Sequence, residues 1–237
     1  MLVLTGAVAI GVWQYQGERE SDTRQQWAQR ATRELDNQVR QTGAALLGVR
    51  GLFEGSNAVE KGEFARFAAI QLRHSSLLGL TWAPRVPAAA RQGFERASGR
   101  RILDQAPDGS QRPASARAEY FPLRFIEPVA PDALGLDTGV RDGNVALAIA
   151  RDTGRPAMSA TIHLGAAPAD RGTALIAAVY RTGAPLATVA QRRVALRGFT
   201  RGPWRYDQLV APILRLLPAG SRLELVDAGE TIFASAG

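Results

Sequence analysis

The fold is decided by a stretch that begins Glu119-Tyr-Phe-Pro-Leu-Arg-Phe-Ile-Glu-Pro128 and ends Ala174-Leu-Ile-Ala-Ala-Val-Tyr-Arg181. Aromatic and β-branched residues in both runs predict strands, and Gly and Pro mark their ends. Between them, apolar residues spaced for one helix face predict a helix over residues 143–152. A nucleophile, a base and an orienting group do not occur together in this stretch. It is therefore typical of a binding scaffold rather than a reaction centre.

Composition narrows the class of protein. The chain has 237 residues and 46% of them are apolar, which is enough to bury a core and does not indicate disorder. It has no cysteine, so a disulfide-stapled fold and a cysteine-based metal or redox site are excluded. The formal charge is +7, but the arginines are spread along the chain and no cluster of them alternates with aromatic residues. We therefore expect no nucleic-acid binding.

Residues 1–16 are uncharged and mostly apolar. A membrane-spanning helix needs about 20 apolar residues, and a signal peptide has a basic start and a small-residue cleavage site. We therefore expect the end of a transmembrane helix whose beginning is trimmed, with Trp13 and Tyr15 at the membrane interface. A short buried core helix is the alternative.

Residues 17–53 have the period of one long helix. Apolar residues recur every three or four positions and form a continuous stripe, while Arg, Gln and Glu occupy the other faces. Such a stripe needs a partner. In one alternative this stalk helix forms a homodimer, its lower half facing a second copy of the chain; in the other it packs wholly within one subunit. The stripe consists of Trp27, Ala31, Leu35, Val39, Thr42, Leu46, Val49 and Phe53.

The order of the predicted elements favours an α+β fold, in which the long N-terminal stalk helix is followed by two PAS-like antiparallel-sheet units. Residues 54–183 would form a membrane-distal unit that binds a ligand. Residues 184–237 would form a membrane-proximal unit, whose first strand spans residues 194–204.

Six short motifs lie in and around the central stretch. They are Val49-Arg-Gly-Leu-Phe53, Tyr120-Phe-Pro-Leu-Arg-Phe-Ile-Glu-Pro128, Gly135-Leu-Asp137, Ala150-Arg-Asp-Thr-Gly154, Ala178-Val-Tyr-Arg181 and Gly198-Phe-Thr-Arg-Gly-Pro-Trp-Arg-Tyr-Asp-Gln-Leu209. In order and spacing they resemble the CHASE domain, the extracytoplasmic sensor found on histidine kinases and nucleotide cyclases. The resemblance covers roughly residues 38–237. It implies a sensor segment outside the cytoplasm.

The ligand is expected over the sheet of the distal unit, between the strand at residues 120–127 and the strand at residues 173–180, since these carry aromatic and small residues. Asp137 or Asp142 would anchor a polar group of the ligand, and Ser159 would add a hydrogen bond. Alternatively, Asp137 ties down its own turn through backbone amides. The residues expected to bind the ligand are Tyr120, Phe125, Glu127, Leu136, Asp137, Asp142, Ser159, Gly165, Ile176 and Ala178.

The resemblance also bears on the ligand class. In the plant branch of the family, the cytokinin receptors, an aspartate just before the central helix holds the adenine group, and a threonine on a later strand assists it. Here the first position falls near residues 142–144, and the second is Ile176, which has no hydrogen-bonding group. Ser159 and Gly165 fall at other positions that line or border the plant pocket. These departures disfavour an adenine-type cytokinin as the ligand.

We therefore expect a small-molecule sensor domain on the periplasmic side of the inner membrane. It would pass ligand binding through the stalk helix to a cytoplasmic output module of the histidine kinase or diguanylate cyclase type. We expect no catalysis, because His74 and His163 are the only histidines and no catalytic or phosphate-binding motif occurs; nor does any motif indicate a metal or a cofactor. A periplasmic protein-interaction module without a small-molecule ligand is the alternative.

Overall fold

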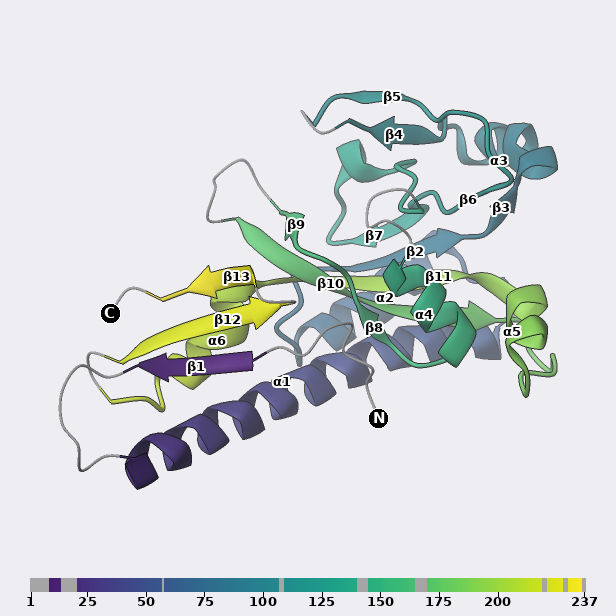
Figure 1. Cartoon of the computed structure of the whole chain (residues 1–237). Helices are drawn as coiled ribbons and strands as arrows, with labels where there is room; N and C mark the ends of the chain where they lie inside the picture. The colour runs from purple at the N-terminus through teal and green to yellow at the C-terminus, as the bar shows by residue number, and fades with distance from the viewer. Residues whose placement is uncertain are drawn as a thin grey trace.

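The computed structural model of the chain describes residues 9–13, 21–56, 58–106, 109–139, 145–164, 170–218, 221–227 and 230–235. Its central element is an antiparallel sheet in the strand order β7-β2-β11-β10-β8, with β9 also paired to β10 (Figure 1). The two longest strands, β10 and β11, pair along their length and form the middle of the sheet. The strands are β2 (Leu80–Pro84), β7 (Phe125–Glu127), β8 (Ala157–Met158), β9 (Ile162–His163), β10 (Arg171–Tyr180) and β11 (Leu196–Arg205).

Helices cover both faces of this sheet. The long helix α1 (Ser21–Gly55) and α2 (Lys61–Leu72) pack on one face, and α4 (Val145–Thr153) packs on the other. Side chains of a strand alternate between the two faces. On β10, Leu175, Ala177 and Val179 therefore join the core with α1, whereas Ala174, Ile176 and Ala178 join the core with α4.

A second, three-stranded sheet lies beside the first half of α1 (Figure 1). Its strand order is β1-β12-β13, with β1 (Ala9–Trp13), β12 (Arg222–Asp227) and β13 (Glu230–Ala234). The helix α6 (Tyr206–Leu214) packs against α1 and joins the same core. The predicted α+β fold, with a long N-terminal helix followed by antiparallel-sheet units, is confirmed.

The other elements form the end of the molecule farthest from the second sheet (Figure 1). A small core of Val86, Ile102, Ala114 and Tyr120 holds several of them together. The elements are β3 (Val86–Pro87), the 3-10 helix at Ala88–Ala90, α3 (Arg91–Ser98), β4 (Leu103–Gln105), β5 (Gln111–Pro113), β6 (Glu119–Tyr120), the 3-10 helix at Pro131–Ala133 and α5 (Val189–Ala195).

The prediction of a transmembrane helix in residues 1–16 is wrong where the structure describes them. Residues 9–13 form strand β1, which pairs antiparallel with β12 from Ala9 opposite Val226 to Trp13 opposite Arg222. The run contains Ile, Val and Trp, which favour strands, and a neighbouring strand is present to take up its backbone hydrogen bonds. In the described part of the chain, no helix has both the length and the apolar content needed to cross a membrane.

The stalk helix exists, as α1, and the chain itself covers most of its stripe. Leu35, Val39 and Leu46 are buried by the chain itself, in one core with α6 and the second sheet. The helix therefore packs within one subunit, which was the alternative to the homodimer. The homodimer through this helix stays a prediction; the stripe's buried apolar residues would not supply its interface.

The boundary between the two predicted units also needs correction. Strand β11 was assigned to the proximal unit, but it pairs with β10 on one side and with β2 on the other, in the middle of the first sheet. The distal sheet therefore extends to Arg205. A strand's own residues predict that it is a strand, whereas its neighbours are set by long-range packing, and this is why the assignment failed.

Candidate functional site

The face of the six-stranded sheet that α4 covers, called here the α4 side, carries small residues and one buried charge. Four alanines of the strands lie on it with Ile176 and Phe199. Arg201 follows Phe199 by two positions on β11 and so points to the same side. In the sheet register Arg201 lies between Ile176 of β10 and Thr81 of β2. The alanines are Ala83, Ala157, Ala174 and Ala178.

The polar groups on the α4 side are almost completely removed from solvent. Arg201 is 7% exposed and Thr81 is 8% exposed. Arg201 interacts with other groups of the protein, but the Thr81 hydroxyl has no hydrogen-bond partner among the described residues. Burying a polar group without a partner costs about 1–3 kcal/mol. A guanidinium with five donors beside an unsatisfied hydroxyl is suited to an anionic or hydroxyl-bearing molecule.

Asp137 holds its own turn through backbone amides, which is the alternative to its role as a ligand anchor. Its Oδ1 accepts hydrogen bonds from the amides of Phe121, at 2.8 Å, and Gly139, at 2.9 Å. Its Oδ2 accepts one from Arg117 Nη1 at 2.7 Å. Both oxygens of the carboxylate are therefore engaged in holding its own loop. Gly135, two residues earlier, has φ 92° and lies against the Arg101 carbonyl, where a side chain would collide.

Arg117 ties this loop to the hairpin of β4 and β5. Its Nη2 donates to Asp104 Oδ2 at 2.6 Å, so one guanidinium bridges Asp104 and Asp137. Burial by itself would raise the pKa of the Asp104 carboxyl, but the hydrogen bonds from Arg117 and from the Ser115 amide outweigh it and lower that pKa. The loop over the α4 side is thus held by a buried ionic cluster.

Three of the expected ligand residues lie away from the α4 side. Strand β7 is separated from β10 by β2 and β11. The two strands between which the ligand was expected are therefore not neighbours in the sheet. Phe125 packs on the α1 side, with its ring 5.5 Å from that of Phe64. Glu127 lies on the edge strand, opposite Leu80. The Tyr120 hydroxyl donates to the Ser115 carbonyl, and its ring belongs to the small core at the end of the molecule.

Of the remaining expected residues, Ile176 and Ala178 lie on the α4 side. Both are fully buried at its centre. Ser159 accepts a hydrogen bond from the Ala174 amide at 2.9 Å and donates to the Ala160 carbonyl at 2.8 Å, which fixes the chain after β8. Leu136 is buried and bridges to Leu103 through its backbone. Asp142 and Gly165 lie outside the described residues.

Sequence reasoning missed Arg201 and Thr81. Arg201 lies inside an otherwise uncharged run, Gly198-Phe-Thr-Arg-Gly-Pro-Trp204, and a charge within a central strand is the signal that would have found it. Thr81 carries no comparable signal, since threonine is common in strands.

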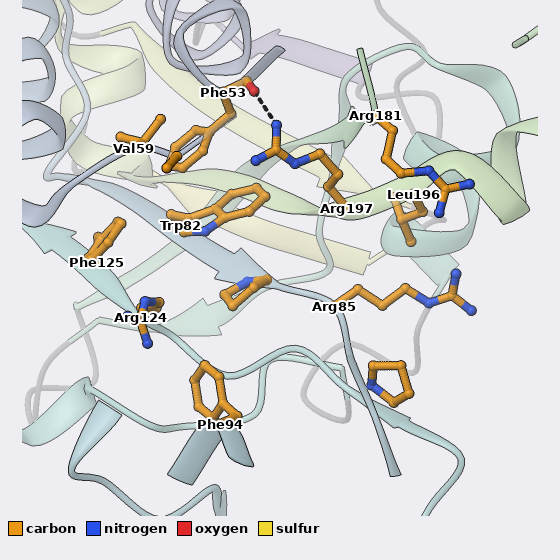
Figure 2. Close-up of a pocket in the computed structure, with 13 residues that line it drawn as sticks. Phe53, Val59, Trp82, Arg85, Phe94, Arg124, Phe125, Arg181, Leu196 and Arg197 are labelled. Atoms are coloured by element: carbon orange, nitrogen blue, oxygen red, sulfur yellow. Dashed lines mark hydrogen bonds between the residues drawn. The ribbon is translucent and has the colours of Figure 1, made fainter. Parts of the chain in front are cut away.

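An open groove of about 510 Å³ lies elsewhere, near the end of α1 (Figure 2). The rings of Phe53 and Trp82 stack in it with centroids 4.0 Å apart. An adjoining hollow of about 290 Å³ shares Phe94 and Phe125 with it. Among the described residues, no aspartate or glutamate lines either of them. The two together are called the arginine groove, and its cations are Lys61, Arg85, Arg100, Arg124, Arg181 and Arg197.

The described residues include no group of three or more His, Cys, Asp or Glu side chains that could hold a metal ion.

Comparisons with known proteins concern most of the chain. The model of the CHASE domain family matches residues 57–234. Among solved structures, the chain is similar to the ligand-binding domain of the amino acid chemoreceptor PctC of Pseudomonas aeruginosa PAO1, in complex with GABA, with a TM-score of 0.53 and 15% sequence identity. That similarity covers 90% of this chain and 76% of the chemoreceptor chain, and at this identity it concerns the fold alone. No curated protein sequence matches the chain.

Proposed function

Because this chain belongs to the CHASE domain family, a family of extracytoplasmic sensor domains, we propose that it binds a small molecule on the α4 side and signals to an output module across a membrane. The observation that carries the proposal is the buried pair of Arg201 and Thr81 in the middle of an alanine-rich sheet face. Small-molecule sites are mostly apolar, with few polar groups that fix the ligand's orientation.

The chemistry of these groups favours a ligand with a carboxylate. A guanidinium binds a carboxylate through two parallel hydrogen bonds, and it does so more strongly in a site from which water is excluded. The chemoreceptor domain with the similar fold has GABA bound, which is a carboxylate-bearing molecule. Ile176 and Ala178 would contact the ligand's apolar part, and Ser159 at the end of β8 would border the site.

Contacts between α4 and α1 supply a route for the signal. The Tyr180 hydroxyl at the end of β10 donates to the Arg151 carbonyl in the last turn of α4. Arg50 of α1 lies over the Tyr180 ring, 5.4 Å from its centroid, and its Nη1 donates to the Gly154 carbonyl at 2.9 Å. A ligand that moves α4 would therefore move groups bonded directly to the long helix. We propose that α1 carries this change to an output module of the kinase or cyclase type.

A thermal-shift screen tests the binding site. The folded domain would be mixed with amino acids, other carboxylates and adenine-type purines, because a ligand of the folded state raises the melting temperature. We expect a shift with one or more carboxylates, which Ala178→Trp abolishes and Arg201→Lys reduces. Arg124→Glu, in the arginine groove, serves as the control and should leave the shift unchanged. A shift that survives in both Ala178→Trp and Arg201→Lys would mean that the ligand binds elsewhere.

The periplasmic location is part of the same proposal. A phosphatase reporter joined after Gly237 is active only when it folds outside the cytoplasm. We expect activity from this fusion when it is expressed with the membrane segments of its receptor, and an inactive fusion would contradict the location.

A further inference from the structure

The arginine groove has a strong positive charge that its own residues do not neutralise. Of the described residues that line it, six are cationic and none is acidic. Arg85 is paired with Glu119 outside the groove at 2.6 Å, and Arg197 Nη1 donates to the carbonyls of Phe53 and Ser56. Neighbouring like charges without carboxylates raise the local potential and attract anions.

Two of the arginines have no carboxylate partner within the described part of the chain. Arg124 lies over the rings of Phe94, at 5.7 Å, and Phe125, at 5.6 Å, so its contacts are aromatic rather than ionic. Arg181 follows β10 and is exposed, and its side chain makes no hydrogen bond or ion pair to a described residue. Both guanidinium groups are therefore available to an occupant of the groove.

The charges are distributed along the groove rather than gathered at one point. They come from separate segments: the start of α2, the ends of β2 and β10, strand β11, and the loops before β4 and β7. Figure 2 shows the side chains of Arg85 and Arg181 extending away from Phe125, while Arg124 lies near Phe94. A single small anion cannot contact all of them. An elongated occupant with several negative charges can.

We propose that the arginine groove docks an extended acidic segment of a partner protein. Its carboxylates would pair with Arg124 and Arg181, and interleaved apolar side chains would lie on the partly exposed Val59 and Phe94. Because Arg197 joins the groove to the carbonyls of Phe53 and Ser56, in and just after the last turn of α1, the docked segment would lie against the end of the long helix. This site is separate from the α4 side and does not depend on a small-molecule ligand there.

Fluorescence anisotropy with a labelled peptide tests this docking. The probe is a short peptide in which glutamate alternates with leucine and phenylalanine, and its partner probe carries glutamine in place of each glutamate. We expect the glutamate peptide to bind, the glutamine peptide to bind much more weakly, and binding to weaken as salt is raised. The double variant Arg124→Glu with Arg181→Glu should weaken binding by about tenfold or more, which corresponds to about 1.4 kcal/mol.

A matched control separates the groove from the net charge of the domain. Arg33→Glu with Arg215→Glu reverses two exposed arginines outside the groove, and this variant should bind the glutamate peptide as the parent chain does. Equal weakening in both double variants, or equal binding of the two peptides, would overturn the proposal. So would displacement of the peptide by a single-stranded oligonucleotide that itself binds more tightly. The groove variant should keep any thermal shift from the α4 side, so failure of one proposal is distinguishable from failure of the other.

Discussion

The two faces of the central sheet differ in what fills them. The α1 side is packed with large rings, including Phe53 stacked on Trp82 and the fully buried Trp204. The α4 side has one ring pair, Phe121 against Phe199, but its strands carry four alanines around the buried Arg201. Large interlocking side chains stabilise a fold, whereas small side chains and a buried charge contribute little to stability. The difference indicates that the α1 side contributes more to stability than the α4 side, where the ligand site is proposed.

Removing a ring from the α1 side should have the largest effect. Phe53→Ala deletes a side chain that is 2% exposed and stacked on Trp82, and we expect the free energy of unfolding to fall by about 3–5 kcal/mol. Chemical denaturation measures it. Leu47→Ala, on the same helix but 42% exposed, should change it by only about 0.5 kcal/mol. If Phe53→Ala lowers the free energy of unfolding no more than Leu47→Ala does, the α1 side is not the face that stabilises the domain.

A neighbouring pair of alanines allows the two faces to be compared directly. Ala177 and Ala178 are both fully buried, but the first faces α1 and the second faces α4. We expect Ala177→Trp to lower the free energy of unfolding by about 3 kcal/mol, because that side is filled, and Ala178→Trp by about 1 kcal/mol. Chemical denaturation of the two variants measures both losses. Equal losses would show that the α4 side has no more room than the α1 side.

Acid stability should report the ionic cluster that holds the loop over the α4 side. The pKa of Asp104 is lowered in the folded state, so its contribution is present above the unfolded pKa of about 3.9 and is lost as the pH falls through the folded value. Asp104→Asn should therefore cost about 1–2 kcal/mol at neutral pH and much less at the lowest pH at which the domain stays folded. Denaturation midpoints of the parent chain and of Asp104→Asn, measured from neutral pH down to that lowest pH, test this dependence. A loss that is independent of pH would contradict the role of the charge.

The smallest effect is expected at Thr81. Thr81→Val removes a buried hydroxyl that has no hydrogen-bond partner among the described residues, so the free energy of unfolding should stay the same or rise by up to about 1 kcal/mol. The thermal shift caused by a carboxylate ligand should nevertheless decrease. If stability falls by more than about 1 kcal/mol, the hydroxyl has a structural partner and is not a ligand group.

The sequence predicts the elements of this fold better than their pairing. The stripe from Ala31 to Phe53 predicts α1, and the apolar run at residues 174–180 predicts β10, since both depend on local periodicity. Strand β11 is also predicted as a strand, but its place between β10 and β2 depends on contacts far apart in the sequence. For the same reason the stripe does not reveal whether its partner is a second copy or the chain's own second sheet.

The residues of the candidate site were also predicted where local alternation places them, and not where the order of the strands does. Ile176 and Ala178 were expected to face a ligand and lie at the centre of the α4 side, because strand alternation places them there. Tyr120, Phe125 and Glu127 were grouped with them on residue type alone, and the order of the strands separates them. Arg201 was missed because a single arginine in an arginine-rich chain carries little information until its burial is known.

The bond from Arg197 to the last carbonyls of α1 has a mechanical consequence. It fastens one end of a helix of 35 residues to a central strand of the sheet. At 1.5 Å per residue such a helix is about 52 Å long, so a rotation of about 5° at the fastened end moves the other end by about 4–5 Å. Since α6 and the second sheet share a core with the first half of α1, a rotation about this end would displace them most, while the central sheet beside the arginine groove would move least.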